Sequence, residues 1–130
     1  MRSRKLMVLA GALVLLALVA ATGFAEYDKA KIVAVMRSNM SALPRLNSAA
    51  NGSRFVEAAG HLLTISQGMY TIKDFTPLKG DKEAWDATFA TLLEATWHGL
   101  AACADEDLAA LKAAVTEIQA AMNKGHSTFR

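Results

Sequence analysis

The stretch "RFVEAAGHLLTISQGMYTIK", residues 54–73, carries the clearest structural signal in the chain. Its apolar residues recur at intervals of three and four, which is the spacing of one face of an α-helix, whereas a half-buried β-strand would alternate apolar and polar residues. The segment therefore predicts an amphipathic helix from about Arg54 to Lys73. The apolar stripe of this helix consists of Phe55, Ala58, Leu62, Ile65, Met69 and Ile72.

The same spacing precedes this segment and predicts a helix from about Asp28 to Ala50, after which "NSAANGS" supplies a turn. Pro44 lies inside the predicted helix. Because proline removes a backbone donor and clashes with the carbonyl group four residues earlier, we expect a kink or an early end there. The stripe of this helix consists of Ile32, Val33, Met36, Met40, Leu43 and Leu46.

Two more helices are expected after the break at "DFTPLKGD". The first of them has Asp81 as its expected N-cap and runs through Ala101. The second starts in "ADED", where Asp105 is the expected cap and acidic side chains favour the positive end of the helix. The stripe of the first is Trp85, Phe89, Leu92 or Leu93, Thr96 and Leu100, and that of the second is Leu108, Leu111, Val115, Ile118, Met122, His126 and Phe129.

These four segments define an all-α fold. No segment has the pattern of a β-strand, and the connections between the helices are short. Helices of this length with short loops pack most simply as an antiparallel up-down-up-down four-helix bundle. We therefore expect residues 26–130 to form one such domain.

The first 25 residues are typical of a cleaved secretory signal peptide. "MRSRK" is a basic start, Leu6 to Ala21 is an apolar run, and Gly23 and Ala25 are small residues before the expected cut. The apolar run is 16 residues long, and a membrane-spanning helix needs about 20. We therefore expect a periplasmic protein that has no membrane association after cleavage.

Removal of this segment changes the charge balance, since three basic residues are lost and 11 basic and 12 acidic residues remain. The remaining chain is not basic enough for nucleic acid to be an expected partner. Cys103 is the single cysteine, so no intramolecular disulfide can form. We interpret Cys103 as a small buried residue near a helix end.

His126 stands on the apolar stripe of the last helix, four residues before the end of the chain. This distance corresponds to about 6 Å along a helix axis. In an antiparallel bundle, the same end holds the start of the first helix, the end of the second and the start of the third. The imidazole should therefore be surrounded by Ile32, Val33, Met36, Met69, Ile72, Trp85, Phe89, Met122 and Phe129.

A lone histidine on such a stripe is more often a hydrogen-bonded core residue than a ligand. The other two histidines do not strengthen the case for a metal, because His98 is about 20 Å from the level of Trp85 by helical rise and His61 lies near the opposite end. A zinc or copper site needs three or four converging ligands. We expect His61 and His98 at the surface or at its boundary.

Three stretches make the chain resemble cytochrome c′, a family of periplasmic four-helix haem proteins. They are "SNMSAL" in the first helix, "KEAWDATFATLL" in the third and "MNKGHSTFR" at the end of the fourth. The resemblance covers nearly all of residues 26–130 and is strongest from Lys82 onward. In that family the last helix ends in C-x-x-C-H-x-x-x-R/K, and its cysteines bond covalently to haem.

This chain has Met122 and Gly125 where those cysteines would stand, and it keeps His126 and Arg130. Without the cysteines no thioether bonds can form, so a c-type haem is not expected. The chain is also similar to the soluble periplasmic b-type cytochromes (the cytochrome b562 family). These proteins share the bundle and hold haem b without covalent bonds, through a histidine near the C-terminus and a methionine on the first helix.

The second resemblance implies that His126 and Met36 bind the haem iron. Further haem contacts are then expected in the same region of the bundle, from Met69, Trp85, Phe89, Met122, Gly125, Phe129 and Arg130. For Met69, Met122 and Trp85 the alternative interpretation is core packing, and for Arg130 it is a solvated side chain. The cytochrome c′ alignment instead places Ile32 or Val33 opposite His126, which would leave the iron five-coordinate. Both alignments remain open.

Three functions follow from these alternatives. A six-coordinate haem implies an electron carrier that performs no enzymatic reaction and meets a transient redox partner protein. A five-coordinate haem implies binding of a small gas such as nitric oxide. The loss of the cysteines also fits a haem-free structural or interaction bundle. The resemblance to cytochrome c′ further allows a homodimer through the first two helices.

Overall fold

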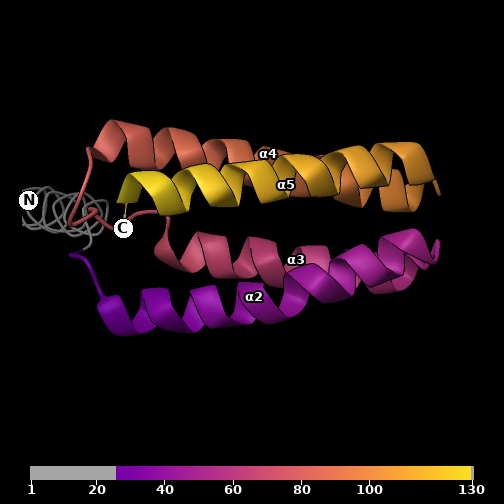
Figure 1. The fold of residues 1–130 in the computed structure, drawn as a ribbon, viewed down its shortest axis with the longest axis horizontal. Coiled ribbons are helices and arrows are strands. Elements are labelled where there is room, and N and C mark those ends of the chain that lie inside the picture. The colour runs from indigo at the N-terminus through magenta and orange to yellow at the C-terminus, as the bar shows by residue number, and fades with distance from the viewer. Residues whose placement is uncertain (1–25, 130) are drawn as a thin grey trace, which may run out of the picture.

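The computed structural model describes residues 26–129. They form four helices, which are α2 (Lys29–Asn51), α3 (Phe55–Ile72), α4 (Lys82–Ala104) and α5 (Leu108–Phe129) (Figure 1). No β-strand occurs within this range, so the predicted all-α fold is confirmed. The predicted signal peptide of residues 1–25 and the predicted haem contact of Arg130 lie outside the described residues.

The helices pack in a ring, because α2 contacts α3, α3 contacts α4, α4 contacts α5, and α5 contacts α2. Successive helices run in opposite directions, so α2 and α4 begin at the end where α3 and α5 finish (Figure 1). This is the predicted antiparallel up-down-up-down four-helix bundle. The topology places the last turn of α5 at the same end of the bundle as the first turn of α2.

Aspartate side chains cap three of the helices. Asp28 and Asp81 accept hydrogen bonds from the backbone N–H groups of the first turns of α2 and α4, which confirms Asp81 as an N-cap. The prediction that Asp105 caps the last helix is wrong. Asp105 is the C-cap of α4, which runs three residues beyond Ala101, and the Asp107 side chain accepts from Ala110 N at 3.0 Å.

Helix α2 does not end early at Pro44 but continues to Asn51, and its axis changes direction in its second half, which agrees with the predicted kink (Figure 1). Its apolar stripe, however, departs from the prediction. Its buried face includes Val35 and Asn39, whereas Val33 and Met40 of the predicted stripe are 36% and 70% exposed. The buried face of α2 is therefore the one that meets α3.

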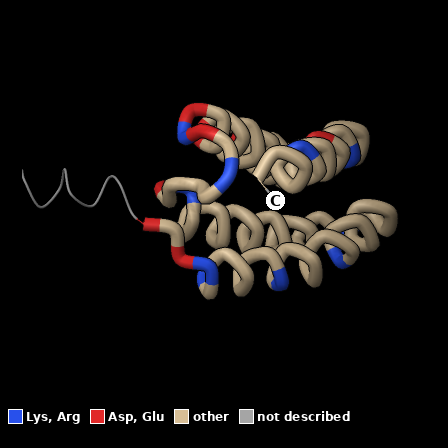
Figure 2. Tube along the Cα trace, turned by 60° about the vertical axis from the view of Figure 1, so that its left-hand side comes forward, with Lys and Arg blue, Asp and Glu red and all other residues tan. Residues whose placement is uncertain are grey.

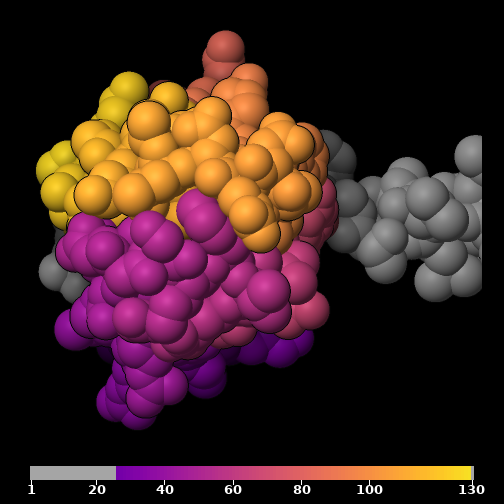
Figure 3. All heavy atoms as spheres, turned by 90° about the vertical axis from the view of Figure 1, so that its right-hand side faces the viewer, coloured from indigo at the N-terminus to yellow at the C-terminus, as the bar shows by residue number. Residues whose placement is uncertain are grey.

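The end of the bundle that holds the α2–α3 and α4–α5 turns is closed by small residues. A Cβ atom on Gly99 of α4 would lie only 2.9 Å from Leu62 Cδ1 of α3 and 3.5 Å from Ala114 Cβ of α5. Figure 3 looks onto this end and shows the two turn regions in contact. Buried alanines allow this approach, and they are Ala49, Ala50, Ala58, Ala102 and Ala114.

Charged residues of both signs occur along the bundle (Figure 2), and none of the Lys, Arg, Asp and Glu side chains among residues 26–129 is fully buried. Within residues 26–129, none of the helices combines the length and the hydropathy that a membrane span requires.

Candidate functional site

A cavity of about 610 Å³ lies at the other end of the bundle, where α2 and α4 begin and α3 and α5 finish. All four helices contribute to its walls. The cavity brings together the predicted site residues that the structure describes, which are Met36, Met69, Trp85, Phe89, Met122, Gly125, His126 and Phe129.

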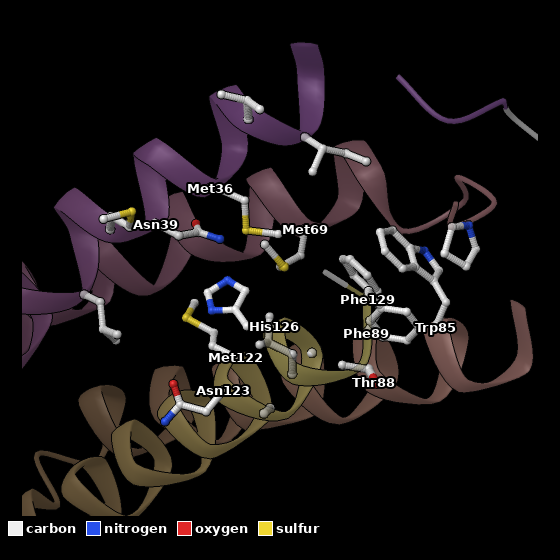
Figure 4. Close-up of a pocket in the computed structure, with 18 of the residues that line it drawn as sticks. Met36, Asn39, Met69, Trp85, Thr88, Phe89, Met122, Asn123, His126 and Phe129 are labelled. Carbon is white, nitrogen blue, oxygen red and sulfur yellow. The ribbon is translucent and has the colours of Figure 1, made fainter. Parts of the chain in front are cut away.

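His126 is half-buried on the last turn of α5. Figure 4 shows its imidazole ring projecting from α5 into the cavity, towards α2 and α3. The ring therefore faces the interior of the bundle, as the position of His126 on the apolar stripe predicts.

Thioether groups reach the same space from three helices. Figure 4 shows the side chains of Met36 from α2, Met69 from α3 and Met122 from α5 around the His126 ring. Met69 is 4% exposed, whereas Met36 and Met122 are half-buried. Met40 also lines the cavity, so every methionine after residue 25 borders this one site.

Three aromatic residues form the part of the cavity wall that lies next to the α3–α4 loop. The ring centroid of Trp85 lies 4.7 Å from that of Phe89 and 5.1 Å from that of Phe129, the latter in an edge-to-face arrangement. Trp85 is 4% exposed, and its Nε1 donates to the carbonyl oxygen of Lys73 at 2.9 Å. Because the indole N–H is already bonded, Trp85 contributes an apolar surface to the cavity.

Two glycines shape this wall. Gly125 of α5 faces α4, since a Cβ atom there would lie 3.4 Å from Thr88 Cγ2. Gly80, which the sequence predicts only as part of the break between two helices, has φ +82°, and a Cβ atom on it would lie 2.9 Å from the ring of Phe129. Gly80 thus allows the α3–α4 loop to lie against the last residue of α5. Its place after Pro77 in a turn was the only available signal.

Sequence reasoning missed the polar lining of the cavity. Asn39 of α2 is 4% exposed, and its Oδ1 is buried without a hydrogen-bond partner among the described residues. Its spacing from Ile32, seven residues earlier, could have placed it on the buried face. Polar side chains elsewhere on the lining come from Arg37, Thr88, Gln119 and Asn123.

The position opposite His126 has three candidates on α2, because Ile32, Val33 and Met36 all line the cavity. Ile32 is 7% exposed and Val33 is 36% exposed. Figure 4 shows the Met36 thioether directed towards the cavity from the helix that faces α5 across it. Met36 is therefore well placed to approach the same space as the imidazole.

The other two histidines and Cys103 do not line the cavity. His98 has a 61% exposed side chain, and His61 is half-buried with Nε2 at 3.7 Å from Glu57, so both occupy the predicted surface or boundary positions. The hydrogen bond from Arg54 lowers the pKa of the exposed Glu57 carboxyl. Cys103 is buried, and burial raises the pKa of its thiol.

Residues 26–129 contain no cluster of three or more His, Cys, Asp or Glu side chains suited to a metal ion.

Comparisons of the chain with known protein families, with curated proteins and with solved structures found no match.

Proposed function

We propose that this chain is a periplasmic electron carrier that binds haem b non-covalently in the cavity at the open end of the bundle. One observation carries the proposal, namely that His126 projects into an apolar cavity opposite a methionine on a facing helix. The volume of about 610 Å³ falls within the range of roughly 300–1,000 Å³ that cofactor pockets occupy.

The donor atoms around the cavity suit haem iron better than a bare metal ion. The lining supplies one imidazole and several thioethers, and it includes no carboxylate or thiolate among the described residues. A zinc or copper ion would need three or four converging protein ligands. In haem the porphyrin itself supplies four nitrogen ligands, so the protein has to provide only one or two axial ligands, such as a His/Met pair.

In this proposal each part of the wall has its own task. His126 and Met36 would hold the haem iron, and they reach the cavity from α5 and α2. The aromatic wall of Trp85, Phe89 and Phe129 covers the apolar body of the cofactor and excludes water. Bound haem supplies a one-electron redox centre, and burial together with a methionine ligand favours its reduced form.

Retention of the cofactor then depends on coordination and burial alone. Met122 and Gly125 provide no thiol for covalent attachment. Arg37 is exposed at the edge of the cavity, where it could pair with a carboxylate of the cofactor. A carrier of this kind exchanges electrons with a transient partner protein, for which a small interface is sufficient.

A second candidate function is supported by Ile32, which is buried on the same wall of α2 as Met36. If Ile32 or Val33 occupies the position opposite His126, the iron keeps an open site behind an apolar surface. Such a site would admit a small neutral gas such as nitric oxide and would exclude water.

The optical spectrum of the purified protein separates these functions. The full chain is produced in cells supplied with haem; its pyridine haemochrome identifies the haem type, and the spectrum of the untreated protein reports the coordination of the iron. A low-spin six-coordinate spectrum supports the electron carrier, and a high-spin five-coordinate spectrum supports the gas-binding alternative. A colourless protein that also fails to take up added hemin contradicts both and leaves the haem-free bundle.

The identity of the second axial ligand is tested by three methionine variants. Met36→Ala should convert the spectrum from low spin to high spin. Met40→Ala should leave it low-spin, because the Met40 side chain is 70% exposed. If Met36→Ala stays low-spin and Met69→Ala does not, Met69 is the ligand and our choice of Met36 is wrong.

A further inference from the structure

Asn39 is the most unusual polar residue of the bundle interior. It is 4% exposed, it lines the cavity, and its Oδ1 has no hydrogen-bond partner among the described residues. A buried polar atom without a hydrogen-bond partner lowers the stability of a protein by about 1–3 kcal/mol. An apolar side chain of similar shape at the same place avoids this penalty. The helical packing alone therefore does not explain an asparagine at this position.

The two ends of the Asn39 carboxamide face different surroundings. The oxygen is directed to α3, because Oδ1 lies 3.7 Å from the place of a Cβ atom on Gly68. The nitrogen is turned to the cavity, on the side of His126 (Figure 4). A Cβ atom on Gly68 would also lie 3.1 Å from Val35 Cγ1, so the close approach of α2 and α3 fixes this part of α2.

Met36 is the neighbour of Asn39 on the cavity-facing side of α2. The two residues are three positions apart, and side chains with this spacing lie on adjacent turns of one helix face. Figure 4 shows the thioether and the amide nitrogen projecting from α2 into the same region. An amide N–H is a donor, and a thioether sulfur is a weak acceptor.

We propose that Asn39 is a positioning residue for Met36, to which its amide nitrogen donates a hydrogen bond when the thioether serves as an axial ligand. This inference rests on the proposed function. The hydrogen bond fixes the orientation of the sulfur and withdraws electron density from it, and outer hydrogen bonds of this kind tune a haem site. Weaker donation from sulfur to iron favours the ferrous state.

The test compares Asn39→Leu and Asn39→Ala with Asn47→Leu in the full chain. Asn47 is a half-buried residue of the same helix that does not line the cavity. The hemin-free Asn39→Leu protein should be at least as resistant to urea as the wild type, since the substitution removes the unsatisfied oxygen. With hemin bound, both Asn39 variants should have a lower reduction potential and a partly high-spin spectrum, and Asn47→Leu should match the wild type.

Each alternative outcome has its own meaning. If Met36→Ala becomes high-spin while the Asn39 variants keep the wild-type potential and spectrum, the positioning role is wrong and the proposed function stands. If both hemin-free Asn39 variants are less stable than the wild type, Asn39 is a structural residue and the inference is overturned. If the wild type binds no hemin, or Met36→Ala stays low-spin, it is the proposed ligand set that fails.

Discussion

The Trp85 side chain donates from Nε1 to the carbonyl oxygen of Lys73 at 2.9 Å. This hydrogen bond joins the first turn of α4 to the residue that ends α3, and it does so directly beside the cavity. The same indole packs edge-to-face against Phe129 at the end of α5. Trp85 therefore holds three helix ends together at the open end of the bundle.

Replacement of Trp85 by phenylalanine should lower the free energy of unfolding of the hemin-free protein by about 2 kcal/mol, because it removes the hydrogen bond and part of the packing. The matched control is Trp97→Phe, since Trp97 is 52% exposed; it should stay within about 0.5 kcal/mol of the wild type. Equal urea midpoints for the two variants would contradict this role of Trp85.

Two glycine-to-alanine substitutions should have opposite effects. Gly99→Ala places a methyl group 2.9 Å from Leu62 Cδ1, and overpacking of this kind costs about 1–3 kcal/mol. Gly60→Ala meets nothing within 4 Å, so its higher helix propensity should stabilise the protein by up to about 1 kcal/mol. Thermal unfolding of both variants measures the difference, and a stabilised Gly99→Ala protein would show that the closed end is not tightly packed.

Asp105 and Asp107 precede α5 and should contribute differently to the stability of the protein. Asp107→Ala removes the side-chain acceptor for Ala110 N, and loss of an N-cap costs about 1 kcal/mol. Asp105→Ala changes the C-cap of α4 and should remain within about 0.5 kcal/mol of the wild type. Denaturant titrations measure the free energy of unfolding of both variants. A larger loss of this free energy in Asp105→Ala would support the capping residue predicted from sequence.

Because Cys103 is buried, the free energy of unfolding should depend on pH in the alkaline range. The pKa of its thiol is raised above the ordinary value of 9.0. Above about pH 9 the unfolded chain releases this proton while the folded chain keeps it, so the unfolded state binds fewer protons and stability falls as the pH rises. Stability relative to Cys103→Ala should therefore decrease as the pH rises above about 9. A pH-independent difference would mean that the thiol is accessible to water in the folded protein.

The four helices could be predicted because their apolar residues repeat at helical spacing over long segments. The details depend on the neighbours that each helix meets. Val33 and Met40 fit the stripe of α2 by spacing, but α2 turns its buried face to α3 and leaves them partly or largely exposed. Asp107 was missed as the cap because α4 extends into "ADED" and displaces the start of α5.

The cavity residues could be predicted from helical rise in an antiparallel bundle, since this arithmetic places Met36 at the level of His126. This arithmetic does not identify two residues that contribute to the cavity. Asn39 is polar and was not counted among the apolar stripe. Gly80 acts through a contact with Phe129, which lies in another helix far along the chain. A contact between a loop and a distant helix end leaves no periodic pattern in the sequence.

The central claim is that His126 holds an iron porphyrin in this cavity by coordination. The most direct measurement is an optical titration of the hemin-free protein with hemin, compared with His126→Ala and with His98→Ala, whose histidine is exposed and does not line the cavity. We predict stoichiometric uptake with a low-spin spectrum by the wild type and by His98→Ala, and loss of that spectrum in His126→Ala. An identical titration for all three proteins, or no uptake by any of them, would contradict the claim.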